Sequence, residues 1–391
     1  MALLVLVFDS HPVQYRVPVW QTMEQKSPNS IHVVYASDCS VKGHADEGFG
    51  KTFAWDEPML EGYAHTVLNC EKGKPLVAWG SLTGKGVTSV FEKIKPNAVL
   101  LTGLNYKYDL VAYFAARRRG IPVWLRCETQ DESVHRSKLK GVFRSLIYRI
   151  AYMGFDRIFY IGQLNKQHYL KHGVTLDRLI PAHYATVDRF IKLTDSEKNT
   201  LRQQARFKAC IHETKFVVGF SGKLIPKKNP DILFAMLEYL PEQIRNNIHI
   251  YFLGSGELED SLSIEAERIF KRYGIKTYFA GFVNQTEMPS HYLAMDIMVL
   301  PSRRMGETWG LVANEAMQSG CGVIVSDAVG SSADFNSWER FRVFKEGDAK
   351  DLAKAVTRLA SYERSFDWAG EGMANYSIEA IATAILKTEN I

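Results

Sequence analysis

Short apolar segments alternate with helix-like segments along both halves of this chain, and this alternation restricts the folds that the chain can adopt. The predicted strands of the first half cover residues 3–8, 31–36, 98–102, 122–126 and 157–161. Those of the second half cover residues 216–220, 248–253, 277–279, 297–300 and 322–326. Strands separated by helices form parallel sheets with right-handed crossovers. Two such sets predict an α/β protein with two Rossmann-like, doubly wound domains that face each other across a cleft.

The domain limits follow from the places where this alternation is interrupted. The 391 residues exceed one ordinary hydrophobic core, so two domains are expected. Residues 188–208 are strongly polar, and we place the boundary over residues 188–215, with a first domain over residues 1–190 and a second over residues 210–372. Residues 39–69 are less periodic and predict loops or short strands.

The composition indicates a soluble globular protein, with 46% hydrophobic and 23% charged residues. The first apolar run, residues 2–8, is too short to span a bilayer and lacks the basic start and cleavage pattern of a signal peptide. We therefore expect it to be a buried strand. The cysteines are scattered and odd in number, which argues against a disulfide framework or a zinc site and favours a reducing cytoplasm. They are Cys39, Cys70, Cys127, Cys210 and Cys321.

The net charge of +5 is unevenly distributed, because residues 1–190 carry 24 basic against 17 acidic residues. Within the most basic stretch, residues 136–150 have an amphipathic helical pattern. Its apolar positions are Leu139, Val142, Phe143, Leu146, Ile147 and Ile150, and the positions largely opposite are Arg136, Lys140, Arg144 and Tyr148. A basic amphipathic helix can lie on an anionic membrane surface. An ordinary helix with its apolar face in the core is the simpler interpretation, and we expect that arrangement.

The segment 301–320 carries the most specific chemical pattern of the chain. Glu307 follows a predicted strand, and Glu315 lies in a helix-like stretch that Gly320 would terminate. A strand, a glycine-containing loop and a helix N-terminus form a site for an anion. Carboxylates beside such a site need another ligand, and sugar hydroxyls can donate hydrogen bonds to them. The pattern therefore predicts a nucleotide-sugar site.

A basic loop follows the first strand of the second half. Ser221 and Gly222 follow this strand, and Lys223 and Lys228 come next, on the side that is expected to face the cleft. Lysines there could bind a diphosphate and stabilise it as it leaves. Alone, this sequence is an ordinary solvated loop, and only the glutamate pair in the same domain favours the phosphate role. Gly254 and Gly256 allow close approach of a ligand to the backbone but do not complete a dinucleotide fingerprint.

These motifs together resemble the donor domain of retaining GT-B glycosyltransferases of family 4, the glycosyl transferases group 1. The motifs that occur in the order of that family are Ser221-Gly-Lys-Leu, Lys228, Gly254-Ser-Gly, Gly281-Phe282, Met295-Asp296, Leu300-Pro-Ser and Glu307-x7-Glu315. The resemblance is close over residues 215–330 and looser over residues 156–190 and near residues 376–379. It implies a C-terminal helix over about residues 375–391 that packs back on the first domain.

The resemblance implies a role for each matched residue. Glu307 would contact the donor sugar and support a developing oxocarbenium ion, and Lys228 would share the catalytic role by binding phosphate. Glu315 would accept hydrogen bonds from the ribose. The remaining donor-binding residues would be Gly222, Lys223, Gly254, Trp309, Gly310, Leu311 and Val312. Lys223 stands where the family usually has arginine, so a bidentate contact with phosphate is lost.

The first domain contributes weaker signals. A His-Pro-x-Gln-Tyr loop follows the first strand, as in a subset of the family, and its residues are candidates for contact with acceptor or donor sugar. They are His11, Gln14, Tyr15 and Arg16. A local structural bond is an equally good explanation for His11. Many relatives carry a histidine where this chain has Cys127-Glu128, so Glu128 is a possible substitute, or else the partner of a nearby Arg126 or lysine.

The expected activity is transfer of a hexose-type sugar from a nucleotide-diphosphate sugar to a glycan or lipid-linked acceptor, with retention. No Asp-x-Asp sequence is present to hold a divalent ion, so we expect neither a metal nor a cofactor. A DNA glycosyltransferase, a sugar-nucleotide epimerase and a non-catalytic sugar-nucleotide-binding module are the alternatives. An anionic membrane surface is a possible partner, nucleic acid is a less favoured one, and the oligomeric state is open. We expect a cytoplasmic protein that could bind the inner face of the membrane.

Overall fold

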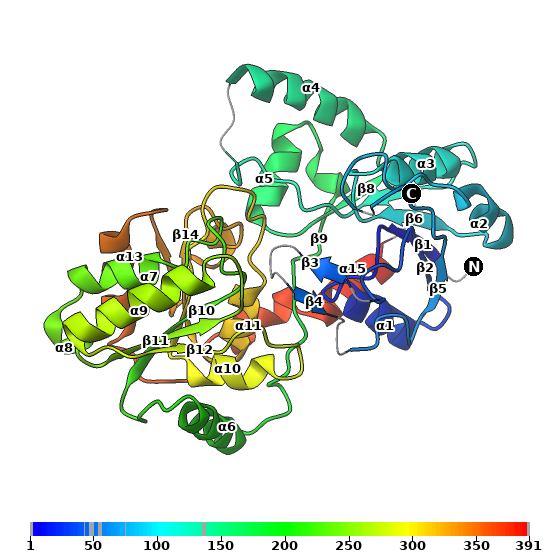
Figure 1. The fold of residues 1–391 in the computed structure, drawn as a ribbon. Coiled ribbons are helices and arrows are strands. Elements are labelled where there is room, and N and C mark those ends of the chain that lie inside the picture. The colour runs from blue at the N-terminus through cyan, green and yellow to red at the C-terminus, as the bar shows by residue number, and fades with distance from the viewer. Residues whose placement is uncertain are drawn as a thin grey trace.

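The computed structural model describes residues 3–42, 44–46, 51–53, 57–74, 76–134 and 138–388. Two parallel sheets, each covered by helices on both faces, form two domains (Figure 1). This arrangement confirms the predicted fold class. Within the described part of the chain, no helix combines the length and the apolar character that a membrane span requires.

The first domain contains a seven-stranded parallel sheet. Its strands, in spatial order, are β5 (Ala64–Val67), β2 (Ile31–Tyr35), β1 (Val5–Asp9), β6 (Ala98–Leu101), β7 (Val123–Leu125), β8 (Arg157–Tyr160) and β9 (Leu179–Pro181). The helices of this domain are α1 (Val17–Lys26), α2 (Val87–Lys93), α3 (Lys107–Arg117), α4 (Lys138–Met153) and α5 (Gln163–Lys171), and a separate hairpin joins β3 (His44–Asp46) to β4 (Lys51–Phe53). The strand order reverses between β1 and β6, where a crevice is expected.

The second domain contains a six-stranded parallel sheet. Its strands, in spatial order, are β12 (Thr277–Phe279), β11 (Ile248–Leu253), β10 (Phe216–Ser221), β13 (Ile297–Leu300), β14 (Gly322–Ser326) and β15 (Phe341–Phe344). Its longer helices are α9 (Glu259–Tyr273), α10 (Met288–Ala294), α11 (Val312–Gln318) and α13 (Ala349–Leu359), and its shorter ones are α7 (Ile232–Ala235), α8 (Glu242–Arg245), α12 (Ser332–Phe335) and α14 (Gly370–Met373). Here the order reverses between β10 and β13, so the loops that carry the lysines and Glu307 leave the same edge of the sheet.

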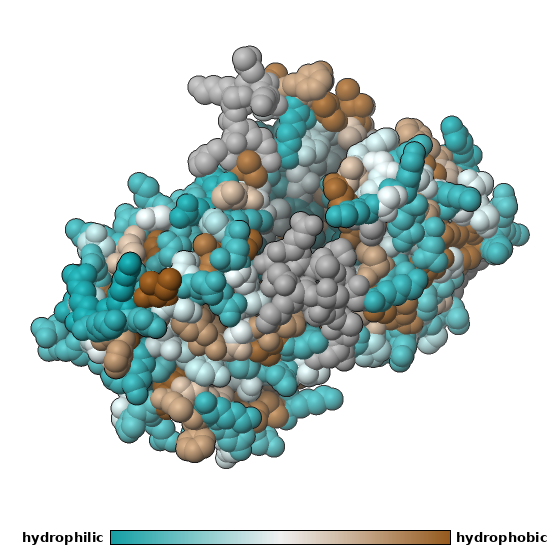
Figure 2. Space-filling model, viewed as in Figure 1, coloured by the Kyte–Doolittle hydropathy of each residue, from teal (hydrophilic) through white to brown (hydrophobic). Residues whose placement is uncertain are grey.

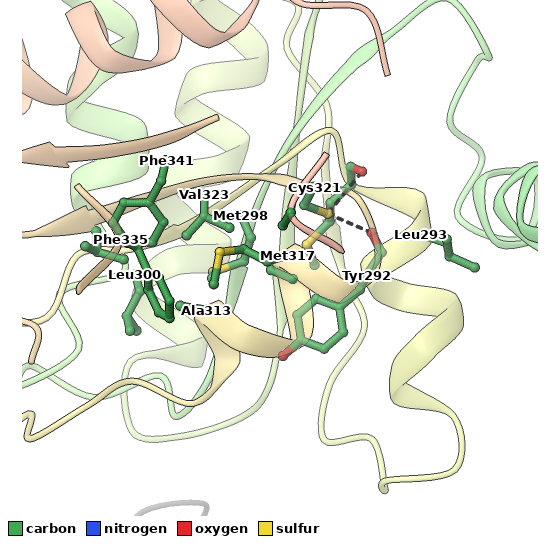
Figure 3. Close-up of a cluster of buried hydrophobic side chains, with 14 of the residues drawn as sticks. Tyr292, Leu293, Met298, Leu300, Ala313, Met317, Cys321, Val323, Phe335 and Phe341 are labelled. Carbon is green, nitrogen blue, oxygen red and sulfur yellow. Dashed lines mark hydrogen bonds between the residues drawn. The ribbon is translucent and has the colours of Figure 1, made fainter. Parts of the chain in front are cut away.

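Apolar side chains fill both faces of each sheet. One cluster of the second domain packs Tyr292 of α10 against Ala313 and Met317 of α11, and Figure 3 shows these residues beside the strands that end at the candidate site. The Cys321 thiol donates to the Tyr292 carbonyl oxygen over 3.1 Å. All five cysteines are free thiols. The last described helix, α15 (Ile378–Leu386), buries its apolar face with α1 in the core of the first domain.

The polar segment after residue 188 contains a helix that the sequence pattern did not predict. This helix, α6 (Asp195–Lys208), begins with a capping box between Thr194 and Glu197 and packs against α10. Leu201 and Ala205 of α6 pack against the apolar cluster of the second domain, and ion pairs complete the contact. Arg202 and Arg206 both pair with Asp296, at the start of β13.

The orientation of α4 corrects our expectation for its apolar face. We expected this face to pack in the core, but it points outward, as the brown side chains over α4 show (Figure 2). Six of its large apolar side chains are at least half exposed: Val142, Phe143, Leu146, Ile147, Ile150 and Met153. The face opposite them makes the intramolecular contacts, through Arg144, Tyr148 and Tyr152. Arg136 and the side chains of Leu139 and Lys140 lie outside the described part of the structure.

Candidate active site

Glu307 lies on the loop after β13 and is held by the basic loop after β10. Its carboxylate accepts hydrogen bonds from the Lys228 ammonium group and, over 3.0 Å, from the Ser302 hydroxyl. Burial acts to raise the pKa of Glu307, but the attraction of Lys228 and Lys227 outweighs it, so the pKa lies below the usual value. The carboxylate is therefore ionised at neutral pH although its side chain is only 12% exposed.

Glycines allow the loops of the second domain to lie against one another. A Cβ atom on Gly254 would lie 1.9 Å from the Gly222 carbonyl oxygen, so the two backbones touch. Gly310 has φ +89°, and a Cβ atom there would lie 2.5 Å from Leu300 Cδ2. A side chain at either position would push apart the loops that bring Lys223 and Glu307 to this edge.

Glu315 lies on α11 and is a different kind of carboxyl group from Glu307. It accepts a 2.6 Å hydrogen bond from the Tyr292 hydroxyl, which also contacts the Ser221 hydroxyl at 3.0 Å. Burial raises the pKa of Glu315 to about 7, and the Tyr292 hydrogen bond and the charge of Arg189 only partly oppose it. This carboxyl group is thus partly protonated at neutral pH.

One cavity of about 300 Å³ brings together most of the predicted donor-binding residues. Lys223 and Lys228 lie with Gly222 and Gly254 in its lining, and Glu315 and Val312 come from the α11 side. Gln14 and Tyr15 of the first domain also line it, so the cavity lies between the domains. Gln14 Oε1 is buried there with no hydrogen-bond partner among the described residues. Burial raises the pKa of Tyr15, which therefore stays a neutral hydroxyl group.

A second cavity, of about 370 Å³, collects the other candidates of the first domain. His11, Arg16 and Glu128 line it together with Asp109 and with Thr308 of the second domain. Arg16 pairs with buried Asp9 at 3.0 Å, and His11 contacts the neighbouring Ser10 hydroxyl at 2.9 Å through Nδ1. Burial raises the pKa of Asp109 to about 7. The cavity is therefore polar and contains groups of both charge signs.

The partners of Glu128 are hydroxyl groups rather than the basic residues that the sequence suggested. Its carboxylate accepts hydrogen bonds from the Tyr184 hydroxyl and, over 3.3 Å, from the Thr308 hydroxyl. Arg126 instead donates to the Ala182 carbonyl oxygen and stacks over the Tyr184 ring. Glu128 thus connects the first domain to the residue that follows Glu307.

The Trp309 side chain points away from both cavities. It is 3% exposed, packs against Tyr376 and Phe335, and donates from its indole nitrogen to Asn314 Oδ1 over 2.9 Å. Only the backbone of Trp309 is then placed to act on a ligand. Gly310 and Leu311 follow it and lead directly into α11.

A family model for glycosyl transferases group 1 matches residues 202–371. The chain carries a glycosyl transferases group 1 domain. This domain contains the whole second sheet, both lysines and both glutamates. Gln14, Tyr15 and all residues that line the second cavity except Thr308 precede it in the sequence.

Two relatives are similar in sequence to part of this chain. The mannosylfructose-phosphate synthase of Agrobacterium fabrum is 28% identical over 194 residues, which are 48% of this chain and 40% of that protein. An uncharacterized glycosyltransferase of Methanocaldococcus jannaschii is 31% identical over 120 residues, which are 31% of this chain and 29% of that protein. The chain thus spans less than half the length of these two relatives.

Solved structures resemble the chain over nearly its full length. HepE of Anabaena in complex with UDP has a TM-score of 0.68 at 18% identity, and the match covers 98% of this chain and 98% of that chain. The sucrose-phosphate synthase from Thermosynechococcus elongatus has a TM-score of 0.67 at 15% identity and covers 98% of this chain and 97% of that chain. These likenesses show the two-domain GT-B fold.

The sequence pattern missed the residues that fasten the group 1 domain to the first domain. The loop after β7 donates from Gln130 Nε2 to the Glu307 carbonyl oxygen over 3.3 Å. The Gly306 amide donates to the Ser133 carbonyl oxygen over 2.7 Å, and Val134 forms a bridge with Met305. These contacts join residues far apart in the sequence, so no local motif could reveal them. Tyr292 was missed for the same reason.

One cluster of potential metal ligands occurs among the described residues. The ligand atoms of Asp131, His168 and His172 lie within 4.8 Å of one another, outside both cavities. The Asp131 carboxylate already pairs with Lys171 at 3.0 Å and with Arg144 at 3.6 Å. Two cations beside the only carboxylate disfavour a divalent ion there, and we interpret the cluster as an anchor that holds α4 and α5 to the loop after β7.

Proposed function

We propose that this protein is a retaining glycosyltransferase that moves a hexose-type sugar from a nucleotide-diphosphate sugar to a glycan or lipid-linked acceptor without a metal ion. The cavity between the domains carries this proposal, because it places two lysines and a buried carboxyl group around one space large enough for a nucleotide. HepE, which shares the fold, has been solved in complex with UDP-glucose, and this supports a nucleotide sugar as the ligand.

The two lysines supply the positive charge for the diphosphate. Lys223 and Lys228 both lie in the loop after β10 and line the cavity. Negative charge develops on the diphosphate as the glycosidic bond breaks, and fixed cations stabilise it most in a site shielded from water. Lysine ammonium groups can do this without a bound metal ion.

Glu307 supports the sugar while this bond breaks. Lys228 and Ser302 fix its carboxylate and keep it ionised. Its negative charge would stabilise a sugar carbon that gains positive charge. The same lysine can contact Glu307 on one side and the diphosphate on the other. Retention then proceeds through attack on the face that the diphosphate leaves, with no covalent sugar–enzyme bond.

The second cavity is the proposed acceptor site. It is polar, it adjoins Thr308, and the carboxyl groups of Glu128 and Asp109 can accept hydrogen bonds from acceptor hydroxyls. A lipid-linked acceptor would require the enzyme to work at the inner face of the membrane.

Release of nucleoside diphosphate from a panel of nucleotide sugars tests the activity. We expect release with one or a few donors, first with water and then faster with a matching glycan, and we expect the rate to persist in excess chelator. The anomeric configuration of the product is read by NMR. Inversion would contradict the retaining mechanism, loss of activity with chelator would contradict metal independence, and binding without release would favour the non-catalytic module.

Donor binding is expected to tighten as the pH rises. Ribose hydroxyls donate to the ionised form of Glu315, whose pKa is about 7 in the unliganded protein, so binding lowers this pKa. Affinity for a nucleotide sugar should increase by about tenfold between about pH 6 and about pH 8. Calorimetry at several pH values measures this, and Glu315→Gln should bind more weakly with a flat pH profile. A pH dependence that survives in Glu315→Gln would assign the titration to another group.

A further inference from the structure

The outer face of α4 is an apolar surface that no described part of the chain covers. Its six exposed side chains occupy about 140° of the helix circumference at 100° per residue. Their exposed fractions run from 50% at Ile147 to 77% at Met153. Figure 1 shows α4 at the periphery of the first domain. Contiguous apolar surface of this kind marks a site of interaction with a protein or a membrane.

The inner face of α4 shows why the helix does not simply turn its apolar side inward. Tyr148 stacks on Tyr152, whose hydroxyl contacts His168 Nε2 at 2.8 Å. Ser145 contacts His172 Nδ1 at 3.0 Å, and Arg144 lies over the Tyr148 ring. The polar and aromatic side of α4 thus packs against α5 and the loop after β7, and the apolar side of α4 is exposed to water.

The positive charge beside the apolar face of α4 indicates which partner covers this face. Arg149 is exposed on α4 at the edge of the apolar face, and Arg118 is exposed just after α3, which contacts the end of α4 through Arg117 and the Gly154 carbonyl oxygen. The nearby acids Asp131 and Asp156 are paired with basic residues. Two copies joined through this patch would bring like charges together, whereas an anionic bilayer offers both apolar chains and negative head groups.

We propose that α4 lies in the interface of an anionic lipid bilayer, with its apolar face among the acyl chains and Arg149 at the head groups. An amphipathic helix binds in this way when apolar burial and electrostatic attraction act together. The segment that leads from β7 into α4 also lines the second cavity, through Cys127, Glu128 and Thr129. One short chain segment thus runs from the proposed acceptor site to the helix that would contact the bilayer.

Co-sedimentation with vesicles tests this proposal. We expect the full chain to bind vesicles of phosphatidylcholine mixed with phosphatidylglycerol, and to bind phosphatidylcholine alone more weakly. Phe143→Ser combined with Ile150→Ser should lower the partition coefficient by at least about tenfold, because two side chains no longer insert. Arg149→Glu should lower it by about fivefold or more at low salt and by less at high salt.

A matched control replaces two apolar side chains that are also more than half exposed, on other helices. Phe207→Ser with Ile264→Ser should bind vesicles like the unchanged protein, since neither residue lies near α4. Equal loss in both double variants, or no binding to either vesicle, would overturn the proposal. So would a dimer in solution that the Phe143 and Ile150 changes dissociate. Stabilisation of each variant by a nucleotide sugar without vesicles reports on the donor site separately.

Discussion

Replacement of Glu307 by glutamine is expected to lower the rate of sugar transfer by about 10²- to 10³-fold, the range measured when one preorganised electrostatic group is removed from an active site. Glutamine keeps the size of the side chain and removes its negative charge. The loss should fall mainly on kcat, because the charge stabilises a sugar carbon that becomes positive only as the bond to the diphosphate breaks.

The surroundings of Glu307 make this effect specific. Lys228 and Ser302 hold the carboxylate in one position, and its lowered pKa keeps it charged over the working pH range. Lys228→Ala should also reduce the rate, and the double variant should lose less than the product of the two single losses, because the two side chains act as one unit.

Steady-state release of nucleoside diphosphate, with circular dichroism to check folding, measures these losses. Glu267→Gln, which changes an exposed acid on α9, serves as the control and should leave the rate unchanged. A folded Glu307→Gln protein with the original kcat would show that this carboxylate takes no part in the reaction.

Replacement of Asp296 by alanine is expected to destabilise the second domain by about 3–5 kcal/mol, which is the usual cost of leaving a buried charge without its partner. Asp296 pairs with Arg202 and, at 2.6 Å, with Arg206, whose side chain is 3% exposed. It also accepts a 2.7 Å hydrogen bond from the Val217 amide at the start of β10. Its loss would therefore loosen α6 from the sheet, leave the buried Arg206 guanidinium without a carboxylate, and remove an acceptor from the Val217 amide.

The pH dependence of stability has a definite sign here. Burial raises the pKa of Asp296, but the three neighbouring arginines outweigh it, so the pKa in the folded protein lies below the usual 3.8. A carboxyl group with a lowered pKa stabilises the folded state above its unfolded pKa, and this contribution is lost as the pH falls through the folded value. Asp296→Ala should remove that part of the acid sensitivity.

Urea denaturation measures the free energy of unfolding. Asp195→Ala provides the control on the same helix, because this acid is 71% exposed and pairs weakly with Lys198 at 3.6 Å. Its loss should cost less than about 1 kcal/mol. Equal costs for the two substitutions would show that the buried ion pair does not hold α6 in place.

Several features could be predicted from the sequence because they depend on neighbouring residues. Apolar runs such as residues 297–300 coincide with buried strands, since an all-apolar segment of that length fits a strand covered on both faces. Glu307, Glu315 and the two lysines follow strands whose carboxyl ends must meet at one edge of a parallel sheet. The short strands β9 and β15 were missed, because they are brief and their register is set by their neighbours in the sheet. The short strand β5 lies within residues 39–69, for which loops or short strands were predicted.

Other features depend on residues that are distant in the sequence. The sequence around Arg202 and Arg206 is typical of a polar linker, and only the structure shows that both arginines pair with Asp296. The pKa of Glu315 depends on burial beneath Tyr292, and the position of the Glu307 loop depends on Gln130 and Ser133 of the other domain.

The sequence by itself determined the α/β class, the two doubly wound sheets and the identity of the charged residues at their edges, because periodicity and local strand–loop–helix patterns are properties of adjacent residues. Only the tertiary structure decided which side of α4 faces water. An amphipathic pattern defines two faces but not their direction, and here the aromatic and polar contacts of Tyr148 and Tyr152 with α5 fix the inner side. The same contacts leave the apolar side free for the membrane surface that we propose.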